Sequence, residues 1–318
     1  MNQKVSVIIP TYNVEKYIRE CLESALCQSY TNIEIICIDN NSTDNTINYL
    51  KEKQAQHPDR ITVGVEEKQN ASAARNKGIK LAAGEYIQFL DADDLLDEHK
   101  IERQMNIIRE ANYPDFIASA FIRVSLSGGE TVIDINSIDS WLGLLRAQLG
   151  ITSANLFKKD SILAIDGWDE SLSSSQEYDL MFRLMKNNAT ISFDEIPLTK
   201  IRERASGSIS KINEEKNVER LIELMLRIKF YLEENKSDWV QNHHKEITQI
   251  LFDKIRELSN FNHQNAREYF TKHIQPKFTP EVSPATSKQY VMLYNYLGFT
   301  ASEKISMYLK RFKNMVKN

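Results

Sequence analysis

The sequence predicts an α/β protein with a layered N-terminal domain, built on a mainly parallel sheet, and a helical C-terminal region. Two observations support this prediction. Over the first ninety residues, short apolar runs rich in β-formers alternate with amphipathic helical patterns, which is the order that βαβ units produce. From about residue 213 onward, long amphipathic patterns with few turn residues replace this alternation. We therefore expect two domains, residues 1–212 and residues 213–318.

The N-terminal region contains four expected strands with three helices between them. The strands are the β-branched or aromatic runs at residues 5–9, 33–38, 61–65 and 86–90. The helices are the amphipathic patterns at residues 15–26, 45–54 and 72–83. Pro10 is expected to end the first strand, because proline has no N–H for a sheet ladder. We expect Ser42, Thr43 and Asp44 to cap the second helix and Gly84 to stop the third.

The C-terminal region is expected to be a helical extension. Residues 218–232 and 247–261 predict helices, and the proline-bearing residues 272–287 predict a connector. Residues 301–316 form a basic amphipathic segment, whose cations and those just after it are Lys304, Lys310, Arg311, Lys313 and Lys317. Such a segment can make peripheral contact with an anionic membrane face. More often it is a solvated helix face or a subunit contact, as in a homodimer.

The composition is that of an ordinary soluble globular protein. Charged residues make up 26% and hydrophobic residues 42% of the chain, and the net charge of -4 argues against a general nucleic-acid binder. No apolar run approaches the roughly 18 residues that span a bilayer, and we expect no signal peptide because the N-terminus leads into a strand pattern. Cys21, Cys27 and Cys37 form no CxxC motif, which fits reduced thiols. We therefore expect a cytoplasmic protein, associated with the inner face of the membrane if the basic segment binds lipid.

The most informative motif is the LDADD string at residues 90–94, which places three carboxylates directly after the fourth expected strand. Their mutual repulsion costs free energy unless a cation offsets it, and hard oxygen ligands suit Mg²⁺ or Mn²⁺. The alternative is a solvated turn in which Asp94 or Asp97 caps the next helix. Because parallel sheets bind ligands beyond the carboxyl ends of their strands, we expect Thr11, Asp39 and this turn to meet at one sheet edge.

A series of strings resembles family 2 glycosyltransferases in order and spacing. The strings are VSVIIPTYN (5–13), Gln28, EIICID (34–39), STD (42–44), ARNKG (74–78), GEY (84–86), LDADD (90–94), GWDESL (167–172) and EYDL (177–180). The resemblance covers about residues 4–210. It implies the GT-A fold, a Rossmann-like mixed sheet flanked by helices, together with a nucleotide-sugar donor and inversion at the anomeric carbon.

The resemblance also implies a set of residues around the donor. In the family, the acid that Asp39 matches hydrogen-bonds the uracil ring, although Asp39 could equally cap the following helix. Asp93 is assigned to a divalent ion, Mn²⁺ or Mg²⁺, and Asp91 to the same metal site and to the ribose or donor sugar. Arg75 is expected to face the diphosphate, or else to form a surface ion pair. The donor-binding residues implied are Pro10, Thr11, Tyr12, Asp39, Asn41, Arg75, Asp91, Ala92, Arg202 and Arg204.

Residues 201–208 depart from the family pattern. Many relatives have a histidine near the metal or diphosphate where this sequence has Arg204. Arginine does not ligate metals but pairs with phosphate oxygens, so we expect fewer protein ligands and more cationic help from Arg202 or Arg204. The alternative is a flexible charged lid with a hinge at Gly207 and Ser208. None of the six histidines is then expected to be a ligand.

Inversion requires a carboxylate that takes the proton of the acceptor hydroxyl. The family uses the aspartate of an ED pair, and this sequence has Gln176 and Glu177 there, so Glu177 takes the base position with one extra methylene. Asp179 is the second candidate, or else a residue of the first helical turn. Trp141, Trp168 and residues 153–155 are expected to line the acceptor site, although the two tryptophans could equally be core residues.

The sequence therefore predicts an inverting, metal-dependent glycosyltransferase that uses a UDP-sugar. Its acceptor is expected to be a hydroxyl of a glycan or lipid-linked glycan in the synthesis of cell-surface polysaccharide. A catalytically degenerate scaffold that binds nucleotide sugars is the first alternative. A nucleotidyltransferase is less favoured, because residues 10–13 offer no glycine-rich, lysine-containing phosphate loop after the first strand.

Overall fold

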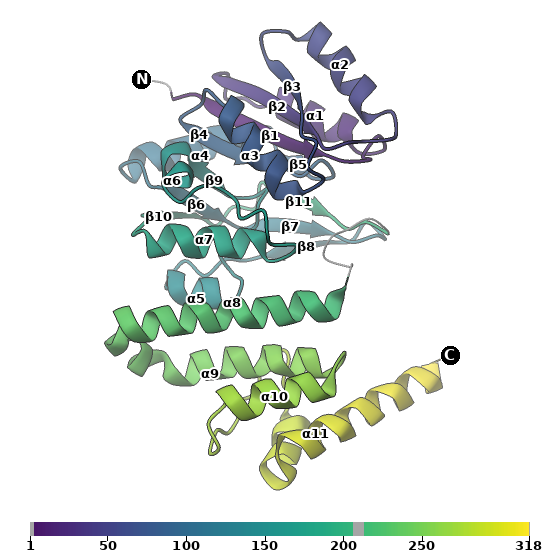
Figure 1. The fold of residues 1–318 in the computed structure, drawn as a ribbon, viewed down its shortest axis with the longest axis vertical. Helices are drawn as coiled ribbons and strands as arrows, with labels where there is room; N and C mark the ends of the chain where they lie inside the picture. Colours follow the sequence, from purple (N-terminus) through teal and green to yellow (C-terminus); the bar gives the residue numbers. More distant parts are fainter. Residues whose placement is uncertain (1–2, 206–212, 318) are drawn as a thin grey trace. The chain divides into compact units, whose positions relative to one another are not determined.

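The computed structural model describes residues 3–205 and 213–317, with side chains described through residue 309. The chain divides into two compact units, Met1–Ile209 and Ser210–Asn318 (Figure 1). The first unit is an α/β structure built on two sheets, and the second unit is helical. The predicted fold class, a mixed sheet flanked by helices with helices at the C-terminus, is confirmed.

The main sheet of the first unit has seven strands in the order β10-β6-β9-β4-β1-β2-β3. Its strands are β1 (Val5–Thr11), β2 (Ile33–Asp39), β3 (Ile61–Val65), β4 (Tyr86–Phe89), β6 (Phe116–Ser119), β9 (Leu156–Lys158) and β10 (Ile191–Asp194). Neighbouring strands are parallel except for β9, which runs antiparallel to both β4 and β6. β1 and β2 therefore end at the same edge as β4, beside the acidic turn.

Pro10 lies inside β1, contrary to the prediction that it ends the strand. β1 continues to Thr11, which pairs with Asp39 of β2. On the other side of β1, the Leu90 N–H donates to the Ile8 carbonyl at 2.9 Å. The next bond of a parallel ladder on this side requires an N–H at residue 10, and proline has none. Pro10 thus ends the ladder with β4 only, which leaves the chain free to turn directly after Leu90.

Helices cover both faces of the main sheet (Figure 1). The helices of this unit are α1 (Ile18–Leu26), α2 (Thr46–Gln56), α3 (Ala71–Leu81), α4 (Lys100–Glu110), α5 (Ser140–Leu145), α6 (Lys159–Leu163) and α7 (Gln176–Lys186). α3 ends three residues before Gly84, so this glycine does not stop the helix. Instead, a Cβ at Gly84 would lie 2.6 Å from the Ser6 N atom, so a close approach to β1 requires glycine there.

The predicted capping of the second helix by Ser42 and Thr43 is wrong. α2 begins after Asn45, whose side chain makes no capping bond, while Asp44 Oδ1 accepts a bond from the Thr46 N–H at 3.0 Å. The Ser42 hydroxyl accepts instead from the Asn13 N–H at 3.1 Å. The polar cluster therefore ties the loop after β1 to the loop after β2, at the sheet edge where the site lies.

A second, four-stranded sheet has the order β5-β11-β7-β8. Its strands are β5 (Leu95–Leu96), β11 (Thr199–Arg202), β7 (Phe121–Val124) and β8 (Glu130–Ile133). β5 follows the acidic turn immediately and pairs antiparallel with β11. This pairing brings the end of β11, about a hundred residues away in sequence, beside the acidic turn.

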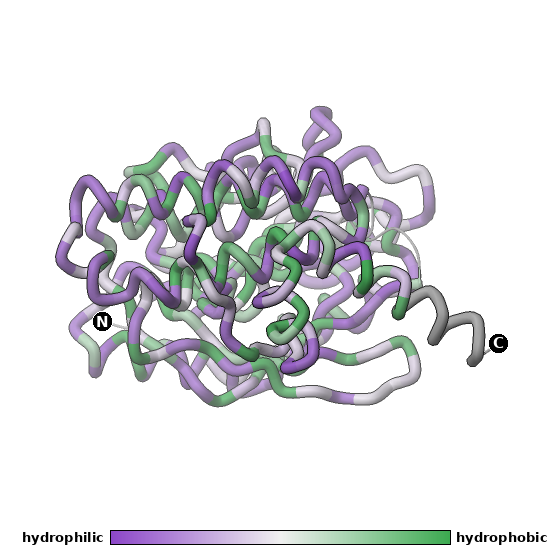
Figure 2. Tube along the Cα trace, turned by 90° about the horizontal axis from the view of Figure 1, so that it is seen from below, coloured by the Kyte–Doolittle hydropathy of each residue, from purple (hydrophilic) through white to green (hydrophobic). Residues whose placement is uncertain are grey.

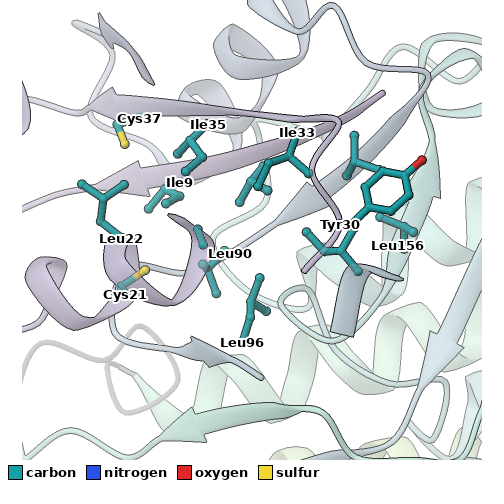
Figure 3. Packing of buried hydrophobic residues seen from close by; sticks show 14 of the residues in the cluster. Ile9, Cys21, Leu22, Tyr30, Ile33, Ile35, Cys37, Leu90, Leu96 and Leu156 are labelled. Carbon is teal, nitrogen blue, oxygen red and sulfur yellow. The ribbon is translucent and has the colours of Figure 1, made fainter. Parts of the chain in front are cut away.

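Buried apolar side chains hold the end of β4 in place (Figure 3). Leu90 is fully buried and lies in a cluster with Ile9 of β1 and Leu22 of α1. Tyr30 packs its ring in the same cluster, and its hydroxyl donates to the Gln3 carbonyl at 2.6 Å. Because Leu90 directly precedes the acidic turn, this packing determines where the turn starts.

The second unit consists of α8 (Glu214–Asn235), α9 (Ser237–Ser259), α10 (His263–His273) and α11 (Lys288–Lys317). The sequence patterns did not identify α10, and α11 begins thirteen residues before the basic segment that we expected at residue 301. Gly298, with φ 71°, interrupts α11 and divides it into two helical segments. Phe252 of α9 lies among the rings of Phe270, Tyr294 and Phe299, which form the aromatic core of this unit.

Hydrophilic and hydrophobic residues alternate along the helices of the chain (Figure 2). Among the described residues, no helix is both long enough and apolar enough to cross a membrane.

Candidate active site

Thr11 and Asp39 sit opposite each other at the carboxyl ends of β1 and β2. Asp39 is buried, and its Oδ2 accepts a bond from the Ser42 N–H at 3.1 Å. Its Oδ1 is buried with no hydrogen-bond partner in the structure. A buried carboxylate oxygen without a donor is costly, so this atom is suited to accept an N–H from a ligand. Thr11, on the neighbouring strand, is also buried, and its hydroxyl donates to the Ile38 carbonyl at 3.3 Å.

Polar bonds connect the loop after β2 to the residues after β3 and to the end of β1. Asn41 has φ 65°, a left-handed conformation that asparagine tolerates, and its Nδ2 donates to the Glu67 carbonyl at 2.6 Å. The Asn40 N–H donates to the Thr11 carbonyl at 2.8 Å. Tyr12 is 46% exposed at the same edge. The predicted residues Pro10, Thr11, Tyr12, Asp39 and Asn41 therefore do come together.

The acidic turn is closed by a bond from the Asp94 N–H to the Asp91 carbonyl at 2.9 Å. Ser153 anchors it from below: its Oγ accepts from the Asp91 N–H at 3.0 Å and donates to Asp94 Oδ2 at 2.7 Å. Asp94 is buried, and the Arg202 N–H donates to its Oδ1 at 3.2 Å, so it does not cap α4. Ser153 is likewise buried, which corrects the interpretation of residues 153–155 as acceptor-lining. Ala92 is buried inside the turn.

Arg75 of α3 connects the acidic turn to α7. Its Nη2 pairs with Asp91 Oδ1 at 2.7 Å, and its Nη1 donates to Gln176 Oε1 at 3.2 Å. The guanidinium lies 4.6 Å from the ring of Trp168, a cation–π distance. Trp168 is only 2% exposed and packs edge-on against Phe89, so it belongs to the core and does not line an acceptor site. Arg75 itself is buried, which excludes a plain surface ion pair.

Arg204 and Arg202 both face the acidic turn. Arg204 Nε is ion-paired with Asp93 Oδ2, and Arg202 Nε donates to the Asp93 carbonyl. Arg202 Nη1 also pairs with Glu20 of α1. The two guanidinium groups lie over the ring of Tyr17, at 5.0 Å for Arg204 and 5.5 Å for Arg202. The predicted hinge at Gly207 and Ser208 lies outside the described residues.

The sequence patterns missed Tyr17, Glu20 and the anchoring role of Ser153. Tyr17 and Glu20 come from the start of α1, where they read as ordinary helix residues with no spacing relation to residue 204. Only the pairing of β5 with β11 brings them together with the arginines. Trp141 is half-buried at the start of α5, and its predicted place at the acceptor site stays a prediction.

Asp91 and Asp93 offer two carboxylates to a divalent cation. Burial and the neighbouring Asp91 charge raise the pKa of Asp93, and Arg204 lowers it. The described residues hold no group of three or more His, Cys, Asp or Glu side chains placed for one metal ion. Two carboxylates nevertheless fit Mg²⁺ or Mn²⁺ when the remaining ligands are water and substrate phosphates. The chemistry of this donor set therefore suits an ion shared with a diphosphate and not an all-protein cage.

Asp179 is fully engaged inside its own unit. Its buried carboxylate accepts a bond from Arg183 Nε at 2.7 Å. Arg183 Nη1 in turn donates to the carbonyls of Ile165 and Gly167, both at 2.7 Å. Side chains two residues apart leave a helix about 200° apart, so Asp179 and Glu177 face different sides of α7. The surroundings of Asp179 are those of a residue that anchors α7 to the preceding loop.

Glu177 lies in the first turn of α7, directly after Gln176, which accepts a bond from Arg75. Ser175 before it has φ 55°, a left-handed conformation that is uncommon for serine and turns the chain sharply into the helix. Burial raises the pKa of Glu177, Arg75 opposes this increase, and the Asp91 charge adds to it. A carboxylate with a raised pKa, within the electrostatic reach of Arg75 and Asp91, has the properties of a general base.

The chain is similar to known glycosyltransferases. Residues 6–155 match the family described as Glycosyl transferase family 2. An uncharacterized glycosyltransferase of Rickettsia felis is 35% identical over 226 residues, covering 67% of this chain and 37% of the relative. Chondroitin synthase of Escherichia coli is 28% identical over 218 residues, covering 67% of this chain and 31% of that protein. The chain thus matches about a third of the length of these relatives.

Solved structures share the fold. TarS 1–349 of S. aureus, in complex with UDP-GlcNAc, has a TM-score of 0.63 at 22% identity, covering 86% of this chain and 77% of that one. The mannosyltransferase PcManGT of Pyrobaculum calidifontis, in complex with GDP-Man and Mn²⁺, has a TM-score of 0.54 at 13% identity, covering 96% and 87%. The GT-A fold that the resemblance implied is confirmed.

Proposed function

The chain carries a family 2 glycosyltransferase domain, and we propose that this domain transfers a sugar from a UDP-sugar to an acceptor hydroxyl with inversion. The observation that carries the proposal is the buried, unpartnered Oδ1 of Asp39 at the sheet edge that also bears the acidic turn. This edge offers a hydrogen-bond acceptor for an N–H of the nucleotide base. The adjoining strand end offers carboxylates and arginines for binding a diphosphate.

The nucleotide is proposed to bind over the ends of β1 and β2. Asp39 Oδ1 would accept the N–H of the uracil ring, which satisfies an atom that is otherwise buried without a partner. Pro10, Thr11, Tyr12 and Asn41 would surround the base and the ribose. TarS has been solved with UDP and with UDP-GlcNAc, which supports a uridine donor here.

The donor diphosphate is proposed to bind to the arginines that contact the acidic turn. Arg204 is ion-paired with Asp93, and a donor phosphate is a second anion whose oxygens can accept hydrogen bonds from the same guanidinium. Arg75 holds Asp91 in place, and Arg202 holds the backbone of Asp93. When bound, a divalent ion held by Asp91 and Asp93 would neutralise charge on the leaving nucleoside diphosphate. PcManGT was solved with GDP-Man and Mn²⁺, which supports the use of a divalent ion here.

Glu177 is proposed as the base that takes the acceptor proton. Its raised pKa makes the carboxylate a stronger proton acceptor, and its neighbours Arg75 and Asp91 already belong to the donor site. Asp179 is less suited, because a buried bond from Arg183 engages its carboxylate. We propose that the catalytic domain spans residues 1–212.

The acceptor is proposed to be a glycan or a lipid-linked glycan in the synthesis of cell-surface polysaccharide. The similarity to chondroitin synthase supports a glycan acceptor. Residues 213–318 are proposed as a helical region that serves acceptor access or localisation, and a homodimer stays a prediction. A cytoplasmic location at the inner face of the membrane is proposed as well, and the three free cysteines, Cys21, Cys27 and Cys37, fit a reducing compartment.

A catalytically degenerate scaffold is the second candidate, and one observation favours it. The ion pair with Arg204 engages the Asp93 carboxylate, the residue that the metal role requires. If this pair stayed closed with donor bound, the domain would bind a nucleotide sugar without turnover.

The test is release of UDP from a panel of UDP-sugars in the presence of Mn²⁺, with UDP affinity measured calorimetrically in parallel. Turnover with one or more donors, lost in Glu177→Gln but kept in Glu110→Gln, is expected. Glu110 is an exposed residue of α4 and undergoes the same chemical change. UDP binding without turnover for any donor and acceptor would favour the scaffold, and absence of UDP binding would refute both.

A further inference from the structure

Charge is distributed unevenly between the two units. Residues 1–209 contain 22 Lys or Arg and 31 Asp or Glu, whereas residues 210–318 contain 18 Lys or Arg and 13 Asp or Glu. The last stretch is the most one-sided, because residues 304–317 contain five Lys or Arg and no Asp or Glu. The chain as a whole is acidic, but its second unit is basic. Anionic surfaces are therefore attracted to the second unit.

The inner face of α11 is anchored in the core of the second unit. Tyr290 and Tyr294 are buried, and the Tyr294 hydroxyl donates to the Phe278 carbonyl at 3.0 Å. Glu303 is buried in an ion pair with Arg256, whose Nε lies 2.6 Å from Glu303 Oε1. Glu303 is the acidic residue nearest to the basic stretch, and this pair already neutralises it. Among the residues of α11 whose side chains the structure describes, Lys288 and Lys304 are exposed.

Large apolar side chains are exposed on both helical segments of α11, which Gly298 separates. Tyr296 is 87% exposed and Tyr308 is 76% exposed. Met292, Leu297 and Leu309 are exposed on the same helix. An exposed tyrosine or leucine alone needs no explanation, but several on one helix beside lysines form the pattern of a helix that lies at a membrane interface. The tyrosines suit the boundary between headgroups and acyl chains, because one end of the ring is apolar and the hydroxyl is polar.

A basic groove lies between α10 and α11. It is open to solvent and has a volume of about 840 Å³, and its lining includes Arg267, Lys272, Lys304, Thr271 and Thr300. Glu268 is the one acidic side chain in its lining. Arginine, lysine and threonine side chains are hydrogen-bond donors to phosphate oxygens. The groove thus places anion-binding groups along α10 and along the second helical segment of α11, which also carries the exposed Tyr308 and Leu309.

We propose that the face formed by α10 and α11 binds an anionic membrane surface, with lipid phosphates in the groove and the exposed tyrosines and leucines of α11 at the acyl boundary. A second copy of the chain fits this face less well, because a symmetric contact would bring the stretch 304–317 against itself and like charges would repel. The proposal goes beyond sugar transfer, since membrane binding requires neither donor nor turnover. It would hold the chain where lipid-linked acceptors are present.

Sedimentation of the full chain with vesicles tests the proposal. Binding is expected to vesicles of phosphatidylcholine mixed with phosphatidylglycerol and not to phosphatidylcholine alone, and to weaken as salt is added. The triple variant Arg267→Gln, Lys272→Gln and Lys304→Gln is expected to lower the partition coefficient on the order of 100-fold, since each cation near the surface contributes about a factor of five. The matched control replaces Lys216, Lys236 and Lys245, which are exposed on or beside α8 and α9, by glutamine.

The apolar contribution has its own variant pair. Tyr308→Ser with Leu309→Ser is expected to weaken vesicle binding, while Phe230→Ser, at an exposed phenylalanine of α8, is expected to leave it unchanged. Equal loss in the groove variant and its lysine control would overturn the proposal. So would equal binding to neutral vesicles, phosphate binding in the groove without vesicle binding, or a dimer that the groove variant dissociates. No donor is present in these assays, so a failure of sugar transfer does not affect their result.

Discussion

The Arg204 guanidinium is ion-paired with the carboxylate of Asp93, and the Tyr17 ring lies beneath the guanidinium at 5.0 Å. The pair joins the end of β11 to the acidic turn that follows β4. The pair places the Arg204 guanidinium where the leaving diphosphate is proposed to lie. It also engages Asp93, the carboxylate that is proposed to hold a metal. When the donor binds, the Arg204 guanidinium must therefore exchange Asp93 for the diphosphate. Removal of the Arg204 side chain tests that exchange most directly.

Arg204→Gln is expected to raise the KM for the donor by roughly 10- to 100-fold, because a charge-assisted bond to phosphate is lost. Arg204→Lys is expected to recover part of the loss, since it keeps the charge without the planar fork. Steady-state kinetics of UDP release measure both. A donor KM unchanged in Arg204→Gln would show that the guanidinium stays on Asp93 throughout turnover.

Glu177→Gln is expected to lower kcat by about 10²- to 10⁴-fold while UDP affinity is retained. In the parent protein, activity is expected to rise with pH through a pKa above the usual 4.5, because burial raises the pKa of Glu177 and the base must be deprotonated. The residual activity of the variant should not show this rise with pH. Full activity in Glu177→Gln would move the base to Asp179.

The same raised pKa predicts a change in stability with pH. Between the usual pKa of glutamate and the raised pKa of Glu177, the folded state binds the proton more tightly than the unfolded state. The free energy of unfolding contributed by this group therefore falls as pH rises through that window. Glu177→Gln is expected to flatten this part of the profile, which urea unfolding at a series of pH values measures. A parallel profile in the variant would contradict the assignment.

Asp39→Asn is expected to weaken UDP binding by about tenfold or more, because the amide presents a weaker acceptor to the base N–H than a carboxylate does. Chelation of divalent ions is expected to stop turnover, since the charge of the leaving diphosphate is then less well neutralised. Calorimetry with UDP and UDP-release assays with a chelator separate the two effects. Asp59→Asn, at an exposed aspartate, is the control. Normal UDP affinity in Asp39→Asn would remove the base-binding role of this residue.

Ser153→Ala is expected to reduce both stability and kcat. The variant leaves the Asp91 N–H and the buried Asp94 carboxylate without their shared partner, at a cost of about 1–3 kcal/mol. Because the turn then loses its anchor, a drop in kcat larger than the change in donor affinity is expected. Ser137→Ala, which removes an exposed bond to Glu195, is the comparison. Wild-type kinetics in Ser153→Ala would show that packing around Leu90 alone positions the turn.

The buried pair between Arg256 and Glu303 is expected to dominate the stability of the second unit. Glu303→Ala should lower the free energy of unfolding by about 3–5 kcal/mol, because it leaves the Arg256 charge buried and unpaired. Glu257→Ala, which removes an exposed pair with Lys254, should cost less than about 1 kcal/mol. Urea unfolding followed by circular dichroism measures both, and similar losses would contradict the prediction.

The main strands were predictable because their apolar runs are local signals. The strand before the acidic turn was placed within one residue of β4, and its buried Leu90 follows from the same run. Pro10 was misjudged because a proline ends only the ladder that its missing N–H faces. In β1 that ladder is the one with β4, while Thr11 still pairs with Asp39. α10 was missed because it buries little beyond Ala266, which leaves a weak apolar stripe.

The sequence by itself determined the order of strands and helices and the position of the acidic turn at a strand end, because periodicity and chain-bending residues act over a few positions. Only the tertiary structure decided that Arg204 pairs with Asp93, that Ser153 anchors the turn and that Trp168 is buried under Arg75. These partners are separated by 59 to 111 residues in the chain. Their contacts depend on which strands pair and how helices cover the sheet, and no local pattern of residues encodes that.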